Sequence, residues 1–110
     1  MNGFNLKNNV LHADETALTA LAQAYGTPLY VYSASGIRDR ISRLRDALAK
    51  ALPGDEQPLV AFACKSNSNI GIIALMNSMG LGADIVSGGE LARALKAGIP
   101  PGKIVYSGVG

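Results

Sequence analysis

Lys65 is the side chain of this sequence whose position best suits nucleophilic chemistry. It directly follows the apolar run LVAFAC at residues 59–64 and has no acidic neighbour in the sequence. Desolvation lowers the pKa of an amine, and a lysine with a lowered pKa attacks carbonyl groups and forms Schiff bases. An ordinary surface lysine at the edge of a loop fits the same position, so the pattern alone leaves both interpretations open.

Two carboxylates stand in and just after the next apolar stretch. Asp84 lies within GADIV at residues 82–86, where a carboxylate has to find a partner or accept a raised pKa. It serves either beside the Lys65 amine or a cationic ring, or in a structural hydrogen bond at a strand end. Glu90 stands three residues after Ser87, which is the spacing of a capping box at a helix start. Capping therefore accounts for Glu90, and a part in catalysis is the alternative.

Other polar groups carry weaker predictions. By the alternation of a strand, Cys64 is expected to face away from Lys65 and to pack in the core. His12 has no Cys, His or carboxylate around it at the spacing of metal ligands, so no metal site is predicted. The Gly-rich helix start after Ser87 could bind a phosphate, but so short a motif is a weak signal.

The elements that have to position these residues alternate along the second half of the chain. Apolar stretches indicate strands at residues 59–64, 83–86 and 103–106, and helices are expected at about 70–79 and 89–97. Strands separated by helices form parallel βα units, because a parallel pair needs a crossover connection. The predicted class is α/β, with functional groups at the carboxyl ends of the strands.

The beginning of the chain predicts a hairpin and a helix. Apolar and polar residues alternate over 4–11 around Asn8-Asn9, a pair that tolerates the backbone of a tight turn. Asp14 is expected to cap a helix over residues 15–25, which Gly26 ends.

A strand and a longer helix are expected next. Residues 29–32 (LYVY) are aromatic and β-branched, which is typical of a strand. Ser33 is expected to cap a helix over about 35–52, which carries an apolar stripe and many charged residues off it.

The composition excludes several classes of protein. With 48% apolar residues, the chain can bury a core and is not expected to be disordered. Its net charge of +2 is spread out, which makes no case for nucleic-acid binding. One cysteine forms no internal disulfide, and the sequence has neither a secretory segment nor an apolar run long enough to span a membrane. A cytoplasmic location is predicted.

Five motifs stand in a fixed order along the chain. They are YGTPLYVY at 25–32, FACKSNSN at 62–69, GADIVSGGEL at 82–91, AGIPP at 97–101 and KIVYSGVG at 103–110. Together they resemble the diaminopimelate decarboxylase family, and the resemblance covers nearly the whole chain. Phe62, Cys64 and Ser66 depart from the commonest form of the family motif, but none of them removes a chemical group that the reaction needs.

The resemblance implies a pyridoxal-phosphate enzyme with an alanine-racemase-like (β/α)8 barrel. Residues 27–110 would form the first βα units of the cofactor-binding barrel, and residues 1–26 a hairpin and helix belonging to a second, β-rich domain or to its junction. Lys65 is implied to hold the cofactor, Asp84 to lie near the cofactor and the lysine, and Glu90 to be a weaker candidate for cofactor binding.

The implied reaction is decarboxylation of meso-diaminopimelate to L-lysine and carbon dioxide, a step of lysine biosynthesis, in a homodimer. The partner is then a small amino-acid substrate, and neither nucleic acid nor a membrane is expected. Two alternatives stay open: a decarboxylase of the same fold acting on ornithine, arginine or carboxynorspermidine, and a non-catalytic pyridoxal-phosphate-binding protein.

The length of 110 residues sets a limit on this fold, because a complete eight-fold barrel needs about 250 residues. We therefore expect an incomplete barrel in a chain that is cut at Gly110. Such a fragment is expected to be inactive by itself and to self-associate through its uncovered strands.

Overall fold

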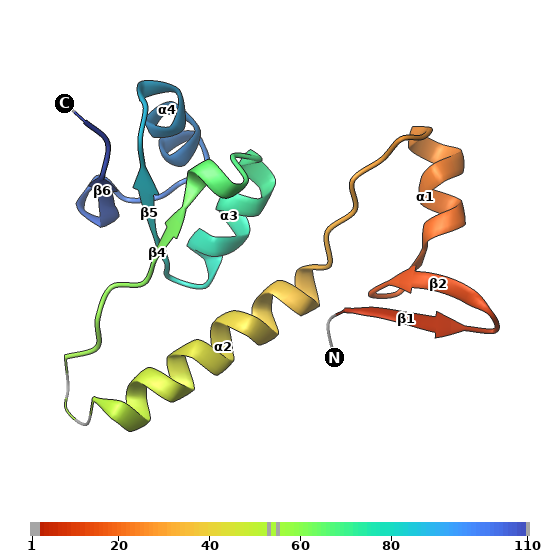
Figure 1. The fold of residues 1–110 in the computed structure, drawn as a ribbon, viewed down its shortest axis with the longest axis horizontal. Coiled ribbons are helices and arrows are strands. Elements are labelled where there is room, and N and C mark those ends of the chain that lie inside the picture. The colour runs from red at the N-terminus through yellow and green to blue at the C-terminus, as the bar shows by residue number, and fades with distance from the viewer. Residues whose placement is uncertain (1–2, 53, 55, 110) are drawn as a thin grey trace. The chain divides into compact units, whose positions relative to one another are not determined.

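The computed structural model describes residues 3–52, 54 and 56–109 (Figure 1). The chain divides into two compact units, Met1–Asp55 and Glu56–Gly110, which we call the first and the second unit. Each unit is described by itself. The expected domain boundary after residue 26 concerns a longer protein and stays a prediction.

The first unit begins with the predicted hairpin, which is confirmed. Strand β1 (Phe4–Lys7) pairs antiparallel with strand β2 (Val10–Ala13), and Lys7 lies opposite Val10 next to the turn. Asn8 and Asn9 form that turn with φ values of 51° and 61°. Asparagine tolerates this left-handed backbone better than other non-glycine residues, which is why the turn forms here.

Helix α1 (Leu18–Tyr25) begins later than the sequence predicts, and the predicted cap by Asp14 is wrong. Its N-cap residue is Ala17, whose side chain makes no capping hydrogen bond. The reason is that Thr16–Ala17 form a short strand, β3, which pairs with β2 and delays the helix. The predicted end of the helix is confirmed, since Gly26 follows it with a φ of 79°.

The strand expected at residues 29–32 is wrong for the part of the chain that the structure describes. These residues carry no strand assignment, and the side chain of Tyr30 is 88% exposed. Aromatic and β-branched residues favour an extended backbone, but a strand also needs a neighbour to pair with, and no described residue pairs with this segment.

Helix α2 (Ala34–Ala51) has the predicted cap. The hydroxyl of Ser33 accepts a hydrogen bond from the amide of Gly36 at 2.9 Å, which satisfies one of the free donors of the first turn. Ile41 lies on its apolar stripe and is buried. On the polar side, Nε of Arg43 lies 3.0 Å from a carboxylate oxygen of Asp39, one helical turn away.

Asp14 contributes a second cap to the same helix. Its carboxylate accepts hydrogen bonds from the amide of Ala34 at 3.1 Å and from the hydroxyl of Ser33 at 2.6 Å, and it also bonds the hydroxyl of Ser35. These hydroxyl donors, Ser33 first, lower the pKa of the Asp14 carboxyl below its ordinary value. The residue expected to cap α1 therefore ties the turn after β2 to the start of α2.

The second unit is a parallel sheet with two crossover helices, which confirms the α/β class (Figure 1). Strands β4 (Ala61–Ala63), β5 (Gly82–Ile85) and β6 (Ile104–Tyr106) pair in that order. Helix α3 (Ile70–Ser78) connects β4 to β5, and helix α4 (Gly88–Lys96) connects β5 to β6. The predicted strands and helices of this unit are all present, with ends shifted by a few residues.

Two features fix how this unit packs. Gly82 permits a close approach of neighbouring strands, because a Cβ atom there would lie 2.2 Å from the carbonyl oxygen of Lys103. The core of the unit lies between the sheet and the helices and contains Cys64, Ile73, Ala83, Ile85, Ala94, Ala97 and Ile99. Cys64 is 0% exposed, so its predicted role in core packing is confirmed.

Candidate functional site

Lys65 lies in a short 3-10 helix, η1 (Cys64–Ser66), that begins directly after β4. The predicted strand over residues 59–64 thus ends at Ala63, and the lysine stands at its carboxyl end. The hydroxyl of Ser66 donates to the carbonyl of Ala63 at 2.7 Å, which holds the turn of η1. The Lys65 amine is exposed and makes no hydrogen bond or ion pair with a described residue. It is therefore available to an external carbonyl group.

Asp84 lies on β5, where its partners in the register are Ala63 on one side and Val105 on the other. Its side chain is half-buried, and Oδ1 accepts a hydrogen bond from the hydroxyl of Ser107 at 2.5 Å. The structure thus contains the structural hydrogen bond that was one of the two interpretations of Asp84. It contains no hydrogen bond or ion pair between Asp84 and Lys65.

Glu90 lies in the first turn of α4, and its backbone amide donates to the hydroxyl of Ser87 at 3.1 Å. Ser87 is thus the helix cap, as the spacing predicts. The Glu90 carboxylate accepts from the amide of Val86 at 2.5 Å, one residue earlier than in a standard capping box. This bond holds the carboxylate at the carboxyl end of β5.

Burial and two carboxylates affect the pKa of the Cys64 thiol. Burial raises the pKa of this thiol most, and the negative charges of Glu90 and Asp84 raise it further. In the structure, Asp84 lies opposite Ala63, the last residue of β4, and the Glu90 carboxylate is bonded to the amide of Val86 just after β5. One amine and two carboxylates gather at the carboxyl edge of the sheet, as the positions of the strand ends predict.

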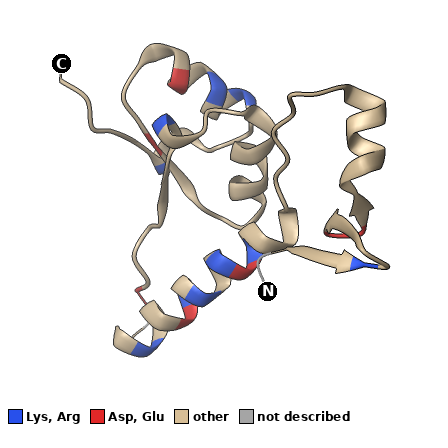
Figure 2. Ribbon diagram, turned by 45° about the vertical axis from the view of Figure 1, so that its right-hand side comes forward, with Lys and Arg blue, Asp and Glu red and all other residues tan. Residues whose placement is uncertain are grey.

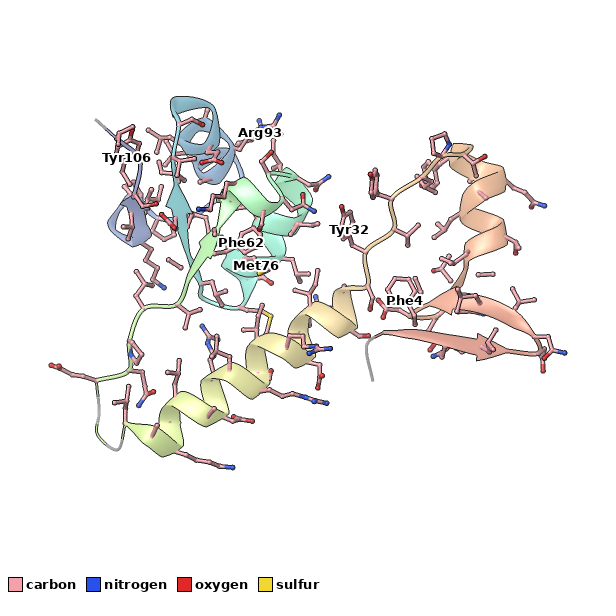
Figure 3. The ribbon with its side chains drawn as sticks, viewed as in Figure 1. Phe4, Tyr32, Phe62, Met76, Arg93 and Tyr106 are labelled. Carbon is pink, nitrogen blue, oxygen red and sulfur yellow. The ribbon has the colours of Figure 1, made fainter. Side chains whose placement is uncertain are left out.

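Two further residues at this edge make contacts that were not predicted. Ser107 directly follows β6, at a strand end where functional groups are expected, but its hydrogen bond to Asp84 was not predicted. Arg93 on α4 donates from Nη1 to the carbonyl of Ser68 at 3.2 Å, and nothing in the sequence indicates this contact across 25 residues. Figure 3 labels Arg93, together with Phe62 on β4.

The charged residues of α4 are segregated along the helix. Glu90 stands in the first turn and Arg93 and Lys96 in the last, so acidic residues precede basic ones (Figure 2). This order matches the partial positive charge at the start of a helix and the partial negative charge at its end. Within the described residues, no helix is long and apolar enough to cross a membrane, and no three His, Cys, Asp or Glu side chains cluster as metal ligands.

Comparisons with known proteins point to one family. Residues 37–110 match the family model described as "Pyridoxal-dependent decarboxylase, pyridoxal binding domain". The chain is 50% identical over 107 residues to the diaminopimelate decarboxylase of Zymomonas mobilis and 46% identical over 110 residues to that of Pseudomonas fluorescens. These alignments cover 97% and 100% of this chain but 25% of each relative, so the chain spans about a quarter of their length.

Two solved structures resemble the chain in fold. A crystal structure of the M. jannaschii diaminopimelate decarboxylase in co-complex with L-lysine matches with a TM-score of 0.89 and 34% identity, over 99% of this chain and 25% of that one. A crystal structure from Aquifex aeolicus matches with a TM-score of 0.80 and 45% identity, over 98% of this chain and 25% of that one. The parallel βα units are therefore part of an incomplete barrel, and the chain belongs to the pyridoxal-binding domain family of the pyridoxal-dependent decarboxylases.

Proposed function

We propose that the full-length gene product is a pyridoxal-phosphate-dependent diaminopimelate decarboxylase and that Lys65 binds its cofactor. The observation that carries this proposal is the amine of Lys65, which no described residue engages, at the carboxyl end of β4 in a chain that is 50% identical to a diaminopimelate decarboxylase. In parallel α/β folds, reactive groups stand at this edge of the sheet.

The residues at this edge fit pyridoxal phosphate by their chemistry. The bound cofactor supplies an aldehyde that a primary amine can attack and a ring that withdraws electrons from bonds at the substrate carbon. Lys65 offers the amine. Asp84 has Oδ1 engaged by Ser107, and Oδ2, which makes no hydrogen bond with a described residue, can accept a hydrogen bond from that amine. Glu90 adds a second negative charge at the same edge of the sheet, and the amide of Val86 holds its carboxylate there.

The substrate follows from the relatives. In the proposed reaction, the bond from the D-configured α-carbon of meso-diaminopimelate to its carboxylate breaks, carbon dioxide leaves, and a proton takes its place to give L-lysine. L-lysine is the ligand in the co-complex of the M. jannaschii relative, which supports a product of this shape in the family. Activity on ornithine, arginine or carboxynorspermidine, or binding of the cofactor without turnover, are the outcomes that would correct the proposal.

A homodimer in the cytoplasm belongs to the same proposal. The homodimer rests on the resemblance to the family, and the cytoplasmic location on the composition of the chain. Sedimentation of the full-length gene product at a mass of two chains is the expected result, and a monomer at all concentrations would contradict the dimer.

The experiment on Lys65 uses the full-length gene product. After incubation with pyridoxal phosphate and reduction with borohydride, mass spectrometry is expected to find the cofactor on the peptide that contains Lys65. Lys65→Ala should lose this label and lower decarboxylation of meso-diaminopimelate about 10³-fold. Lys96→Ala is the matched control, because Lys96 is also exposed and makes no hydrogen bond with a described residue. A label on Lys65 without carbon dioxide release would show a non-catalytic binding protein.

A further inference from the structure

The segment that follows Lys65 is shaped by hydrogen bonds to its own neighbours. The amide of Asn67 donates to the carbonyl of Cys64 at 3.1 Å, and the amide of Asn69 donates to Oδ1 of Asn67 at 3.1 Å. Asn69 in turn caps α3 by accepting from the amide of Ile72 at 3.2 Å. Each of these bonds spans two or three residues, so they fold the segment locally without attaching it to a distant part of the unit.

Arg93 supplies the attachment. Among the described residues, its bond from Nη1 to the carbonyl of Ser68 is the side-chain hydrogen bond that joins residues 65–69 to an element beyond β4 and α3. Because the guanidinium is always charged and presents several donors in a rigid plane, it binds a carbonyl more firmly than a neutral donor does. The carbonyl lies three residues after Lys65.

The helix that carries Arg93 is itself held firmly. Glu90, Arg93, Ala94 and Ala97 follow one another at the spacing of a single helix face. Ala94 is 0% and Ala97 9% exposed, and α4 packs against both α3 and η1. The guanidinium therefore extends from the edge of a packed face toward the segment that holds Lys65 (Figure 3).

The simplest alternative is that Arg93 only complements the negative end of the α4 dipole. Lys96 does so from the same last turn and makes no hydrogen bond with a described residue. Arg93 differs because its guanidinium engages the carbonyl of another segment, and the structure gives it no acidic partner within the described residues. The dipole does not account for that contact.

We propose that Arg93 is a positioning residue, which fixes the Lys65 amine at the carboxyl edge of the sheet by binding the carbonyl of Ser68. The inference rests on the proposed function, because it concerns the amine that binds the cofactor. Without this contact, residues 66–69 keep their local hydrogen bonds, and η1 still packs against α4, but the segment loses its side-chain hydrogen bond to that helix. The amine then samples a wider range of positions. A preorganised group binds its partner more tightly, so the contact raises the affinity for the cofactor.

The test compares Arg93→Met, Arg93→Lys and Lys96→Met in the full-length gene product. We expect Arg93→Met to raise about tenfold the concentration of pyridoxal phosphate that half-labels Lys65 under borohydride, since a hydrogen bond from a charged group is lost. We also expect faster hydrogen exchange, without cofactor, in the peptide that spans residues 65–72. Arg93→Lys, which retains a charged donor, should fall between Arg93→Met and the wild type. Lys96→Met should match the wild type in both measurements.

The outcomes separate this inference from the proposed function. If the wild type is not labelled on Lys65, the proposed function fails. If the wild type is labelled and Arg93→Met has the same affinity and the same exchange, Arg93 does not position the lysine. Faster exchange of Arg93→Met throughout the second unit, with no rescue in Arg93→Lys, would show a general loss of stability and would also overturn the inference.

Discussion

Asp84 has one carboxylate oxygen bonded by a hydroxyl group and one that makes no hydrogen bond with a described residue. The bond from Ser107 to Oδ1 at 2.5 Å holds the plane of the carboxylate on a strand whose side chains otherwise pack in the core. A half-buried carboxylate needs such a donor, because leaving it without one costs about 1–3 kcal/mol. The hydrogen bond from Ser107 therefore fixes the orientation of the Asp84 carboxylate, including its Oδ2.

Ser107→Ala removes that donor. We expect the full-length gene product to keep its fold and to lose about tenfold in kcat, because the Asp84 carboxylate no longer has a fixed orientation at the edge of the sheet that holds Lys65. Ser78→Ala is the control, since the hydroxyl of Ser78 donates to the carbonyl of Leu75 at 2.6 Å on α3. Steady-state kinetics with meso-diaminopimelate measure both variants. Equal values of kcat in both would contradict the proposal that Ser107 orients Asp84 for the reaction.

Cys64 gives a prediction on pH. Burial, Glu90 and Asp84 raise the pKa of its thiol above 9.0, so the folded state holds this proton more tightly than the unfolded state does. The stabilisation is complete below the unfolded pKa and is lost as the pH rises through the raised folded pKa. Urea unfolding from neutral pH to about pH 11 should show a steeper alkaline loss of stability for the wild type than for Cys64→Ala. Parallel curves would contradict the raised pKa.

At the scale of elements, the sequence predicted the turns and helix caps that depend on interactions between residues close in the chain. The turn at Asn8-Asn9, the cap at Ser33 and the cap at Ser87 were all predictable, because each depends on residues within a few positions. The strand at 29–32 and the cap by Asp14 failed for the opposite reason. A strand depends on a distant neighbour, and the Asp14 carboxylate bonds residues about twenty positions away, which no spacing rule indicates.

Asp14 makes the start of α2 sensitive to acid. Its folded pKa is lowered, so the stabilisation is present above the ordinary value of 3.8 and is lost as the pH falls through the lower folded value. Asp14→Asn should therefore weaken the loss of stability at low pH, as followed by urea unfolding. Asp46→Asn, at an exposed position on α2 without a hydrogen bond to a described residue, should leave the acid dependence as it is in the wild type. The same acid dependence in all three proteins would contradict this role.

At the scale of the whole molecule, the strand ends predicted where the candidate residues lie, while their roles stay a prediction. Lys65, Asp84 and Glu90 were singled out because they follow or lie in predicted strands, and the sheet brings them to one edge. The hydrogen bonds of Ser107 to Asp84 and of Arg93 to the carbonyl of Ser68 were not predicted, since such long-range contacts depend on packing that the sequence does not display. The chain spans about a quarter of the length of its relatives, so the partners of the outer strands were beyond prediction as well.

The 110-residue chain by itself is expected to self-associate. Strands β4 and β6 each have one unpaired edge among the described residues, and the side chains of Leu59 and Val105 are both 47% exposed. Val105→Lys should shift sedimentation toward the monomer, because a charge at a strand edge opposes pairing. Ala47→Lys adds the same charge at an exposed position on α2 and should have no such effect. A monomeric wild type at high concentration would contradict the prediction.

The close approach at Gly82 has a consequence for any survey of substitutions. Gly82 stands two residues before Asp84, and a methyl group there would collide with the carbonyl of Lys103 and push β6 away from β5. Ser107, at the other end of β6, would then move off the carboxylate that it holds. In a library of all substitutions scored by growth, Gly82 would therefore tolerate as few substitutions as a catalytic residue does. Yet Gly82 has no side chain that could take part in the reaction. Labelling of Lys65 in the variants would separate this steric constraint from chemistry.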